Sequence, residues 1–165
     1  TCPSMTILEN LSIADNKGKP YNLGRGVNKA KINEYKELLS TLNLGLEDKL
    51  YTQVGSLSGG QRQALSLLMS TMTPIEFLIL DEHTAALDPK TADLIMELTN
   101  QIVQEKKVTT IMVTHNLRYA VEYGNRLIMM HQGEAIIDKS GEEKKALTTE
   151  DIMSTFNKIS VECGN

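Results

Sequence analysis

The segment Leu57-Ser58-Gly59-Gly60-Gln61 combines residue types that can hold an anion at the start of a helix. Two glycines leave backbone N–H groups open to a phosphate, Ser58 adds a hydroxyl donor, and the dipole of a following helix adds about half a positive charge. Apolar residues recur at helical intervals from Ala64 to Met72, and Thr73-Pro74 ends that pattern. An ordinary Ser-capped helix after a glycine turn explains the same residues, so the segment alone leaves both interpretations open.

Two adjacent carboxylates, Asp81 and Glu82, follow the apolar run Phe77-Leu78-Ile79-Leu80. An apolar run of this length predicts a strand that is buried on both faces. Ligands bind at the carboxyl ends of strands in α/β sheets, and paired acids there suit a hydrated Mg²⁺ and an attacking water. A solvated strand end is the alternative, and it fits one acid better than two.

A helix and a second strand follow at βαβ spacing. Asp88-Pro89 predicts an N-cap with proline at the first helical position, and residues 108–113 predict the next strand. This spacing implies parallel strands joined by a right-handed crossover. Four apolar residues are expected to form the buried stripe of the helix: Leu94, Ile95, Leu98 and Ile102.

Helices are predicted for the first part of the chain. Thr6-Ile7-Leu8-Glu9 has the spacing of a capping box, which predicts a short helix there. Residues 16–28 are rich in Asn, Gly and Pro and predict a surface loop. Apolar residues from Ile32 to Leu42 then recur at helical intervals, which indicates an amphipathic helix.

The last part of the chain predicts two helices and a hairpin. Asn116 is a candidate cap for a short helix, and residues 127–130 and 135–137 predict two strands joined by a turn. Glu142 to Lys145 is a charged stretch that we expect to be solvated. Thr148 to Asp151 begins the last helix, whose expected inward residues are Ile152, Met153, Phe156 and Ile159.

Composition excludes some classes of function. The chain has 165 residues with 17 basic and 21 acidic side chains and a net charge of −4, which argues against a nucleic-acid interface. No apolar run approaches the length of a membrane span, and no leader-like segment opens the sequence. Cys2 and Cys163 lack metal-type spacing, so we expect incidental thiols in a reducing, cytoplasmic compartment.

Together these residues resemble the ATP-binding cassette (ABC) ATPases. Leu57 to Gln61 is similar to the signature motif of that family, and Phe77 to Glu82 looks like its Walker B strand with the catalytic glutamate. Ala86-Leu87-Asp88 is similar to the D-loop, and Val113-Thr114-His115 resembles the strand with the switch histidine. The four motifs follow the family order, and the resemblance extends from about Met5 to about Asp138.

The resemblance implies an α/β fold, namely part of a P-loop NTPase with a RecA-like core and a helical subdomain. Residues 1–56 would belong to the helical subdomain, and residues 57–165 to the C-terminal part of the ATPase core. The sequence contains no Gly-x-x-x-x-Gly-Lys-Ser/Thr phosphate loop (Walker A) and no glutamine of the Q-loop type before Met5. We therefore expect a fragment that corresponds to the C-terminal two-thirds of a nucleotide-binding domain and is inactive alone.

The resemblance also implies a role for each site residue. Asp81 would hold Mg²⁺ through water, and Glu82 would orient or deprotonate the attacking water. His115 would hydrogen-bond the γ-phosphate of ATP, although a histidine considered by itself is more often a satisfied core residue. Four signature residues would act on the ATP of a neighbouring subunit in a homodimer, with Asp88 coupling the two sites: Ser58, Gly59, Gly60 and Gln61. His83, where the family usually has proline, and His131 are expected at the surface.

The function implied by the resemblance is that of an ATP-binding and ATP-hydrolysing subunit of a bacterial-type importer, with amino acids as a possible cargo. Its partners would be transmembrane permease subunits and, indirectly, a solute-binding protein, with no nucleic acid. It would lie in the cytoplasm against the inner face of the cell membrane. Two alternatives stay open, a soluble ABC ATPase without a transport role and a non-catalytic fragment that binds a partner.

Overall fold

The computed structural model of this chain describes residues 1–18 and 26–162, with side chains except those of residues 159–162. It forms two compact units, Thr1–Ile111 and Met112–Asn165. These units are defined by compactness and not by function, so they do not test the expected boundary between the functional segments 1–56 and 57–165. That boundary stays a prediction. Most of the predicted loop at 16–28 lies outside the described residues, because these omit residues 19–25.

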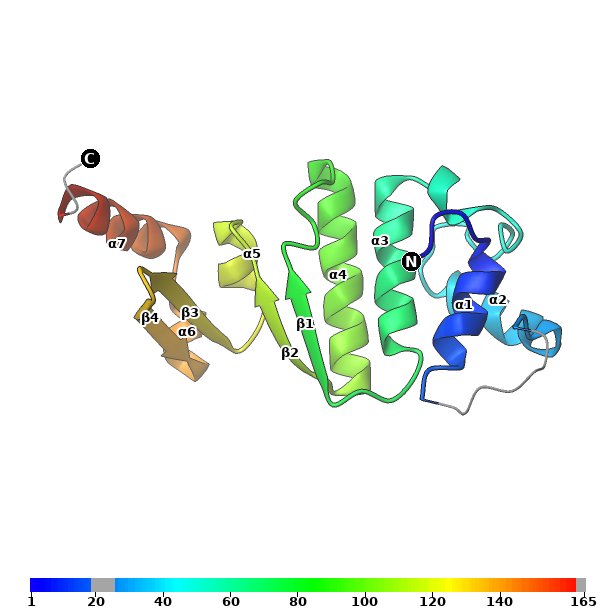
Figure 1. The fold of residues 1–165 in the computed structure, drawn as a ribbon. Helices are drawn as coiled ribbons and strands as arrows, with labels where there is room; N and C mark the ends of the chain where they lie inside the picture. Colours follow the sequence, from blue (N-terminus) through cyan, green and yellow to red (C-terminus); the bar gives the residue numbers. More distant parts are fainter. Residues whose placement is uncertain (19–25, 163–165) are drawn as a thin grey trace. The chain divides into compact units, whose positions relative to one another are not determined.

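The first unit begins with helices and ends in a two-stranded sheet (Figure 1). Its elements in chain order are α1 (Ile7–Asp15), the 3-10 turn η1 (Lys29–Lys31), α2 (Ile32–Ser40), the 3-10 turn η2 (Val54–Ser56), α3 (Gly59–Thr71), β1 (Phe77–Asp81), α4 (Pro89–Lys106) and β2 (Thr109–Val113), whose last two residues belong to the second unit. None of the helices in the described part of the chain is long and apolar enough to span a bilayer.

Helix α1 begins where the sequence predicts, because Thr6 and Glu9 form a capping box. Thr6 Oγ1 accepts a hydrogen bond from the Glu9 N–H at 3.3 Å, and Glu9 Oε2 accepts one from the Thr6 N–H at 2.7 Å. Ile7 and Leu11 on this helix are fully buried. The predicted short helix is therefore confirmed.

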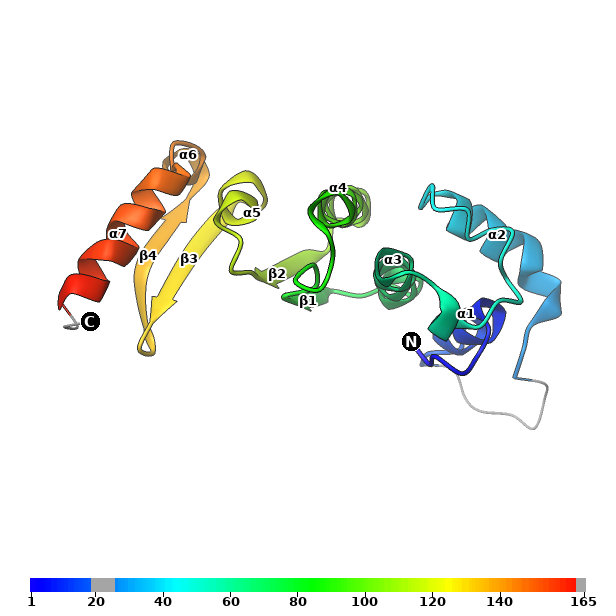
Figure 2. The same ribbon diagram turned by 90° about the horizontal axis from the view of Figure 1, so that it is seen from above.

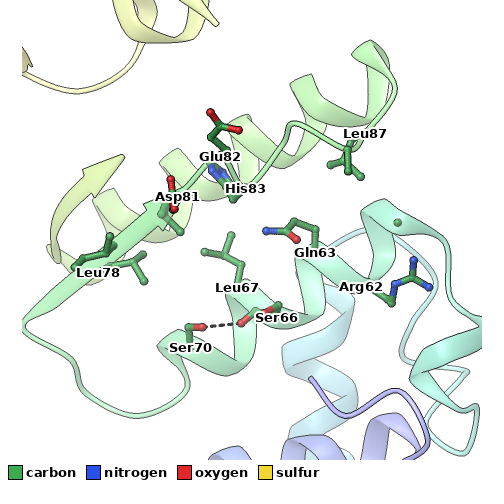
Figure 3. A pocket seen from close by; sticks show the side chains of 14 residues that line it. Arg62, Gln63, Ser66, Leu67, Ser70, Leu78, Asp81, Glu82, His83 and Leu87 are labelled. Carbon is green, nitrogen blue, oxygen red and sulfur yellow. Dashed lines mark hydrogen bonds between the residues drawn. The ribbon is translucent and has the colours of Figure 1, made fainter. Parts of the chain in front are cut away.

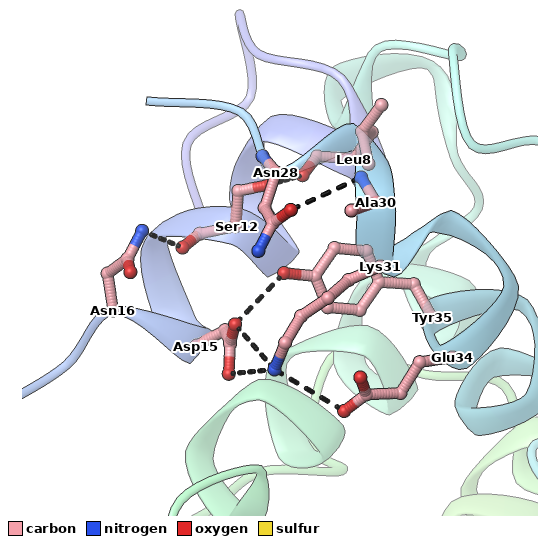
Figure 4. Close-up of polar contacts among 9 residues, drawn as sticks. All are labelled: Leu8, Ser12, Asp15, Asn16, Asn28, Ala30, Lys31, Glu34 and Tyr35. Atoms are coloured by element: carbon pink, nitrogen blue, oxygen red, sulfur yellow. Dashed lines mark hydrogen bonds and ion pairs between the residues drawn. The ribbon is translucent and has the colours of Figure 1, made fainter. Parts of the chain in front are cut away.

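A polar cluster joins α1 to α2 (Figure 4). Asp15 at the end of α1 accepts hydrogen bonds from the Tyr35 hydroxyl at 3.2 Å and from Lys31 Nζ at 3.1 Å. The side chain of Tyr35 is fully buried, and a buried hydroxyl requires such a partner. Helix α2 thus packs its apolar face on α1, which confirms the amphipathic helix predicted from residue 32.

Helices α3 and α4 pack side by side, and Figure 2 looks nearly along both axes. Both helices begin at the end of the unit toward which β1 points (Figure 1). Helix α3 stops before Thr73-Pro74 as predicted, and Lys106 Nζ donates a hydrogen bond to the carbonyl oxygen of Thr71 at 2.7 Å. This arrangement brings the N-terminal end of α3 close to the turn between β1 and α4.

The buried stripe of α4 differs in part from the predicted one. Ile95 and Leu98 are buried as expected, whereas Leu94 is 38% exposed and Ile102 is only half-buried. Ala92 and Thr99 complete the buried face, together with Met96. The prediction was wrong for Leu94 because it considered large apolar residues only. The small residue Ala92 and the polar residue Thr99 occupy inward-facing positions of the helix instead.

Strands β1 and β2 are hydrogen-bonded neighbours, which confirms the two predicted strands. Leu78 is buried, whereas Phe77 is 47% exposed and Ile79 is 64% exposed. Ile111 on β2 is likewise exposed. The expectation that the run 77–80 is buried on both faces is therefore wrong for the structure described here, because α4 covers one face of the sheet (Figure 2) and the other face meets solvent.

The second unit contains a β-hairpin and three helices, in the order α5 (Leu117–Glu122), β3 (Arg126–His131), β4 (Glu134–Ser140), α6 (Gly141–Lys145) and α7 (Thr149–Glu162). Asn116 caps α5, since its Oδ1 accepts a hydrogen bond from the Arg118 N–H at 3.1 Å. Strands β3 and β4 pair antiparallel across Gln132 and Gly133, whose φ values of 47° and 87° suit a two-residue turn of type I′. The predicted cap and hairpin are confirmed.

Two expectations for the second unit were wrong. On α7, Ile152 is buried, but Met153 is 46% exposed and Phe156 is 54% exposed, because the short helix α5 covers only a narrow stripe of α7. The side chain of Ile159 lies outside the described residues. In the charged stretch after β4, Lys144 is only 4% exposed. Its Nζ donates a hydrogen bond to the carbonyl oxygen of Val121, and burial lowers its pKa.

Candidate nucleotide site

Ser58 begins α3 with a capping box that also involves Gln61. Ser58 Oγ accepts a hydrogen bond from the Gln61 N–H at 3.2 Å, and Gln61 Oε1 accepts one from the Ser58 N–H at 3.2 Å. Gln61 Nε2 also donates to the carbonyl oxygen of Leu44 at 3.2 Å. The Gln61 side chain therefore fixes the start of the helix. The capping box between Ser58 and Gln61 was not predicted from the sequence, although Ser-x-x-Gln is capping-box spacing.

The glycines at positions 59 and 60 permit a close approach between α3 and the start of α4. A Cβ atom at Gly60 would lie 2.3 Å from Thr91 Cγ2, and one at Gly59 would lie 3.1 Å from Leu87 Cδ2. Gly60 is accordingly buried. The sequence suggested glycines for phosphate access only, and the structure adds a packing reason for both.

The start of α3 also offers donors to an anion. Within the described part of the chain, the backbone N–H groups of Gly59 and Gly60 have no hydrogen-bond partner, as is usual for the first turn of a helix. The helix dipole adds positive charge at the same end. Ser58 and Gly59 are exposed, so the end of the helix is accessible. These features fit the phosphate groups of a nucleotide.

Asp81 and Glu82 are both exposed at the carboxyl end of β1. Glu82 adopts a left-handed backbone conformation with φ of 43°, which is uncommon for a residue with a side chain. Its carbonyl oxygen accepts a hydrogen bond from the Ala85 N–H at 3.0 Å, which closes the turn toward the D-loop. The strand thus ends in a tight turn that presents two adjacent carboxylates.

The donor set at this strand end suits Mg²⁺ better than a metal held by protein ligands alone. No group of three or more His, Cys, Asp or Glu side chains in the described residues could enclose a metal ion. Mg²⁺ keeps several waters and is commonly held by one or two carboxylates together with substrate phosphates. Asp81 and Glu82 fit that requirement.

His83 and His131 are both half-buried, contrary to the expectation that they are surface residues. His131 is the last residue of strand β3, where the paired strand β4 covers part of it, and His83 packs toward α4. His83 Nε2 lies 3.3 Å from Thr99 Oγ1 on α4, and burial lowers the pKa of the imidazole. The expectation for His83 rested on its standing where the resembled family usually has proline, whereas the turn at Glu82 directs His83 toward α4. By contrast, the D-loop residue Asp88 is exposed and caps α4, accepting a hydrogen bond from the Thr91 N–H at 3.1 Å.

Strand β1, the turn that follows it and one side of α3 line a pocket of about 530 Å³ (Figure 3). Asp81, Glu82 and His83 line it from the strand end, and Gly59 and Gln63 line it from α3. Ser58, Gly60, Gln61 and Asp88 lie outside the lining. The structure thus brings the two acids and part of the signature segment together within the first unit.

His115 belongs to the second unit and follows β2 directly. It is exposed and lies between Thr114 and Asn116, whose N–H donates a hydrogen bond to Thr114 Oγ1 at 3.1 Å. The turn that carries His115 is therefore locally ordered. Its expected contact with a γ-phosphate stays a prediction.

Comparison with known sequences identifies relatives of this chain. A model of the ABC transporter family matches residues 2–85, about half of the chain. The Tyrosine transport ATP-binding protein of Clostridioides difficile (strain R20291) is 53% identical over 156 residues, which cover 94% of this chain and 62% of that protein. The Methionine import ATP-binding protein MetN of Lactococcus lactis subsp. cremoris (strain NZ9000) is 34% identical over 154 residues, covering 90% of this chain and 40% of that protein. The chain therefore spans less than two thirds of the length of these relatives.

Solved structures share the fold. An ATP-binding cassette of an ABC transporter in its ADP conformation matches with a TM-score of 0.72 at 23% identity, covering 99% of this chain and 65% of that chain. A dimeric ATP-binding cassette in a post-hydrolysis state, bound to ADP and Pi, matches with a TM-score of 0.64 at 27% identity, covering 84% of this chain and 57% of that chain. These matches confirm the predicted α/β, P-loop NTPase fold class.

Proposed function

Since this chain belongs to the ABC transporter family of ATP-binding proteins, we propose that it is part of a subunit that binds and hydrolyses ATP to drive solute transport. The observation that carries the proposal is the end of β1, where the tight turn at Glu82 presents two adjacent, exposed carboxylates, Asp81 and Glu82. Phosphoryl transfer to water needs positioning and charge neutralisation more than covalent chemistry, and these residue types supply both.

We assign the roles at the end of β1 to the two acids. Asp81 would hold Mg²⁺, which when bound would neutralise phosphate charge. Glu82 orients the attacking water and accepts its proton. The left-handed turn at Glu82 supports this role because it points the carboxylate away from the β1 backbone and keeps it exposed. His115 donates a hydrogen bond to the γ-phosphate.

The signature residues act on the nucleotide of a second subunit. Ser58 and Gly59 present a hydroxyl and a backbone N–H at the exposed end of α3, and the buried Gly60 adds a second N–H without a described partner. Gln61 holds that end in shape through the capping box. Two such subunits form a head-to-tail homodimer with ATP at the interface, and Asp88 couples the two sites. The dimeric cassette with which this chain shares its fold supports the proposal.

The transported solute is proposed to be an amino acid. The relatives that are 53% and 34% identical carry names that refer to tyrosine transport and methionine import, respectively. The subunit would work with transmembrane permease subunits and, through them, with a solute-binding protein. It would lie on the cytoplasmic side of the cell membrane.

Exchange of Glu82 for Gln in the complete protein that contains this sequence tests the proposal. Glu82→Gln removes the base but keeps its shape, so ATP turnover should fall by a factor of about 10² or more while ATP affinity stays unchanged. ATP-dependent dimers should accumulate, because ATP at the interface is no longer hydrolysed. Turnover is measured by phosphate release, affinity by titration calorimetry and dimers by light scattering.

The exposed residue Glu76, one position before β1 and outside the pocket lining, provides a matched control. Glu76→Gln should leave turnover at the wild-type rate. Wild-type turnover by the Glu82→Gln protein would contradict the assignment of the base. ATP-driven uptake of labelled tyrosine or methionine into vesicles that contain the permease would test the cargo.

A further inference from the structure

His83 anchors the turn after β1 to helix α4, and this turn also contains Glu82. The chain leaves β1 at Asp81, adopts the left-handed conformation at Glu82 and then places the His83 ring toward α4. His83 Nε2 lies 3.3 Å from Thr99 Oγ1. Figure 3 shows the Glu82 and His83 side chains leaving the same turn. Any movement of the His83 backbone therefore moves Glu82, since the two residues are adjacent in the chain.

Which of His83 and Thr99 donates the hydrogen bond between them follows from the single proton that Thr99 Oγ1 carries. Thr99 Oγ1 carries one proton, which it donates to the carbonyl oxygen of Ile95 at 2.7 Å. The hydroxyl oxygen can then only accept from His83, so Nε2 of His83 must carry the proton. Thr99 is 4% exposed, and loss of this acceptor would leave the imidazole N–H without its protein partner.

A left-handed residue needs support from its surroundings because the conformation is disfavoured for a residue with a Cβ atom. On one side of Glu82, β1 is held by its pairing with β2. On the other side, the Ala85 N–H bonds the Glu82 carbonyl oxygen at 3.0 Å and His83 bonds α4. Helix α4 is itself fixed by its cap at Asp88 and by its packing on α3.

We propose that His83 and Thr99 form a positioning pair that holds the Glu82 carboxylate in the orientation needed for attack of water on ATP. This inference rests on the proposed function, in which Glu82 is the general base. Neither His83 nor Thr99 touches the reacting atoms in this scheme. The pair acts through the backbone turn, so its loss should lower turnover without weakening nucleotide binding.

The hydrogen bond itself is tested in the 165-residue chain by NMR of the histidine side chains. The wild-type chain should show His83 protonated at Nε2, with an Nε2–H signal protected from exchange with water. Thr99→Ser keeps the hydroxyl and should keep that signal, whereas Thr99→Val, which has the same shape without the hydroxyl, should lose it. A wild-type His83 protonated at Nδ1, or a protected signal that survives in Thr99→Val, would overturn the proposed pair.

The positioning role is tested by the ATPase activity of the complete protein that contains this sequence. Thr99→Val and His83→Phe should each lower kcat about tenfold or more with KM unchanged, because small errors in geometry are costly to catalysis. Thr99→Ser should retain kcat near that of the wild type. Unchanged kcat in both Thr99→Val and His83→Phe, or a fall in Thr99→Ser as large as that in Thr99→Val, would overturn the inference.

The two assays separate failure of the inference from failure of the proposed function. Absence of ATPase activity in the wild-type complete protein would overturn the proposed function and the positioning role, even if NMR shows the hydrogen bond. An active wild type whose Thr99→Val variant changes KM and ATP affinity instead of kcat would leave the proposed function intact and overturn the positioning role alone.

Discussion

A methyl group at position 60 should disturb the contact between α3 and α4. In Gly60→Ala the new Cβ would lie 2.3 Å from Thr91 Cγ2, far inside van der Waals contact, so the Thr91 side chain or one of the two helices must shift. Overpacking of this kind costs about 1–3 kcal/mol, and the better helix propensity of Ala returns at most about 1 kcal/mol. Taking about 2 kcal/mol, the middle of the overpacking range, and subtracting at most about 1 kcal/mol for helix propensity, we expect a net loss of about 1–2 kcal/mol in the free energy of unfolding.

A second substitution should relieve the clash. Thr91→Ser removes Cγ2, and the next nearest atom of residue 91, Cβ, would be 3.8 Å from the new methyl group, which is an ordinary contact. Gly60→Ala should therefore cost no more than about 0.5 kcal/mol when it is made in the Thr91→Ser background. Gly26→Ala is the control, because no atom of the described residues lies within 4 Å of a Cβ atom there and its φ is not left-handed.

Urea unfolding of the chain, followed by circular dichroism, measures these differences, and hydrogen exchange of the α3 amides assigns the change to the first unit. The expected result is a positive coupling between residues 60 and 91 in a double-mutant cycle. Equal destabilisation by Gly60→Ala with Thr or Ser at position 91 would refute the packing argument. So would a Gly60→Ala chain as stable as the wild type.

Three further predictions concern stability. Lys107 ends α4 with φ of 52°, so Lys107→Gly should stabilise the chain by about 0.5–1 kcal/mol in urea unfolding. Lys106→Gly should destabilise the chain, because it places glycine inside the helix and removes the hydrogen bond to Thr71. Lys144→Ala should cost about 1–3 kcal/mol in the same assay through lost packing and an unpaired Val121 carbonyl, and the exposed Lys145→Ala should be close to neutral. Hydrogen bonds from Thr6 lower the pKa of Glu9 in the folded chain. The stability that Glu9 contributes is therefore complete above the pKa that Glu9 has in the unfolded chain, and it is lost as the pH falls through the lower pKa of the folded chain. Glu9→Gln should flatten the acid side of the stability profile, and Glu97→Gln should not.

Local features of the fold were predictable from the sequence because they depend on neighbouring residues. The capping box at Thr6, the cap at Asp88 and the two-residue turn at Gln132 are each set by a few adjacent side chains and backbone angles. The end of α3 before Pro74 follows from the restriction that proline places on the residue before it. Each of these predictions was confirmed.

Burial was harder to predict because it depends on what packs against each element. Ile79 and Met153 have the apolar character of core residues, yet both are exposed, since no described element covers their side. Lys144 can be buried because the carbonyl oxygen of Val121, distant in sequence, accepts a hydrogen bond from its Nζ. The half-buried position of His83 likewise depends on Thr99 of α4. No local pattern carries that information.

Gly60 now has two separate physical reasons for lacking a side chain, and one pair of variants can distinguish their weight. Packing requires space for Thr91 Cγ2, and the proposed trans-acting role requires that a phosphate approach the backbone N–H groups of Gly59 and Gly60. In the Gly60→Ala chain, Thr91→Ser relieves the packing clash but does not restore phosphate access to the backbone N–H groups. If Gly60→Ala/Thr91→Ser recovers stability but the complete protein still lacks ATPase activity, phosphate access is the constraint that matters for function. Recovery of both would mean that the glycine serves packing alone, and that the expected phosphate contact at position 60 is wrong.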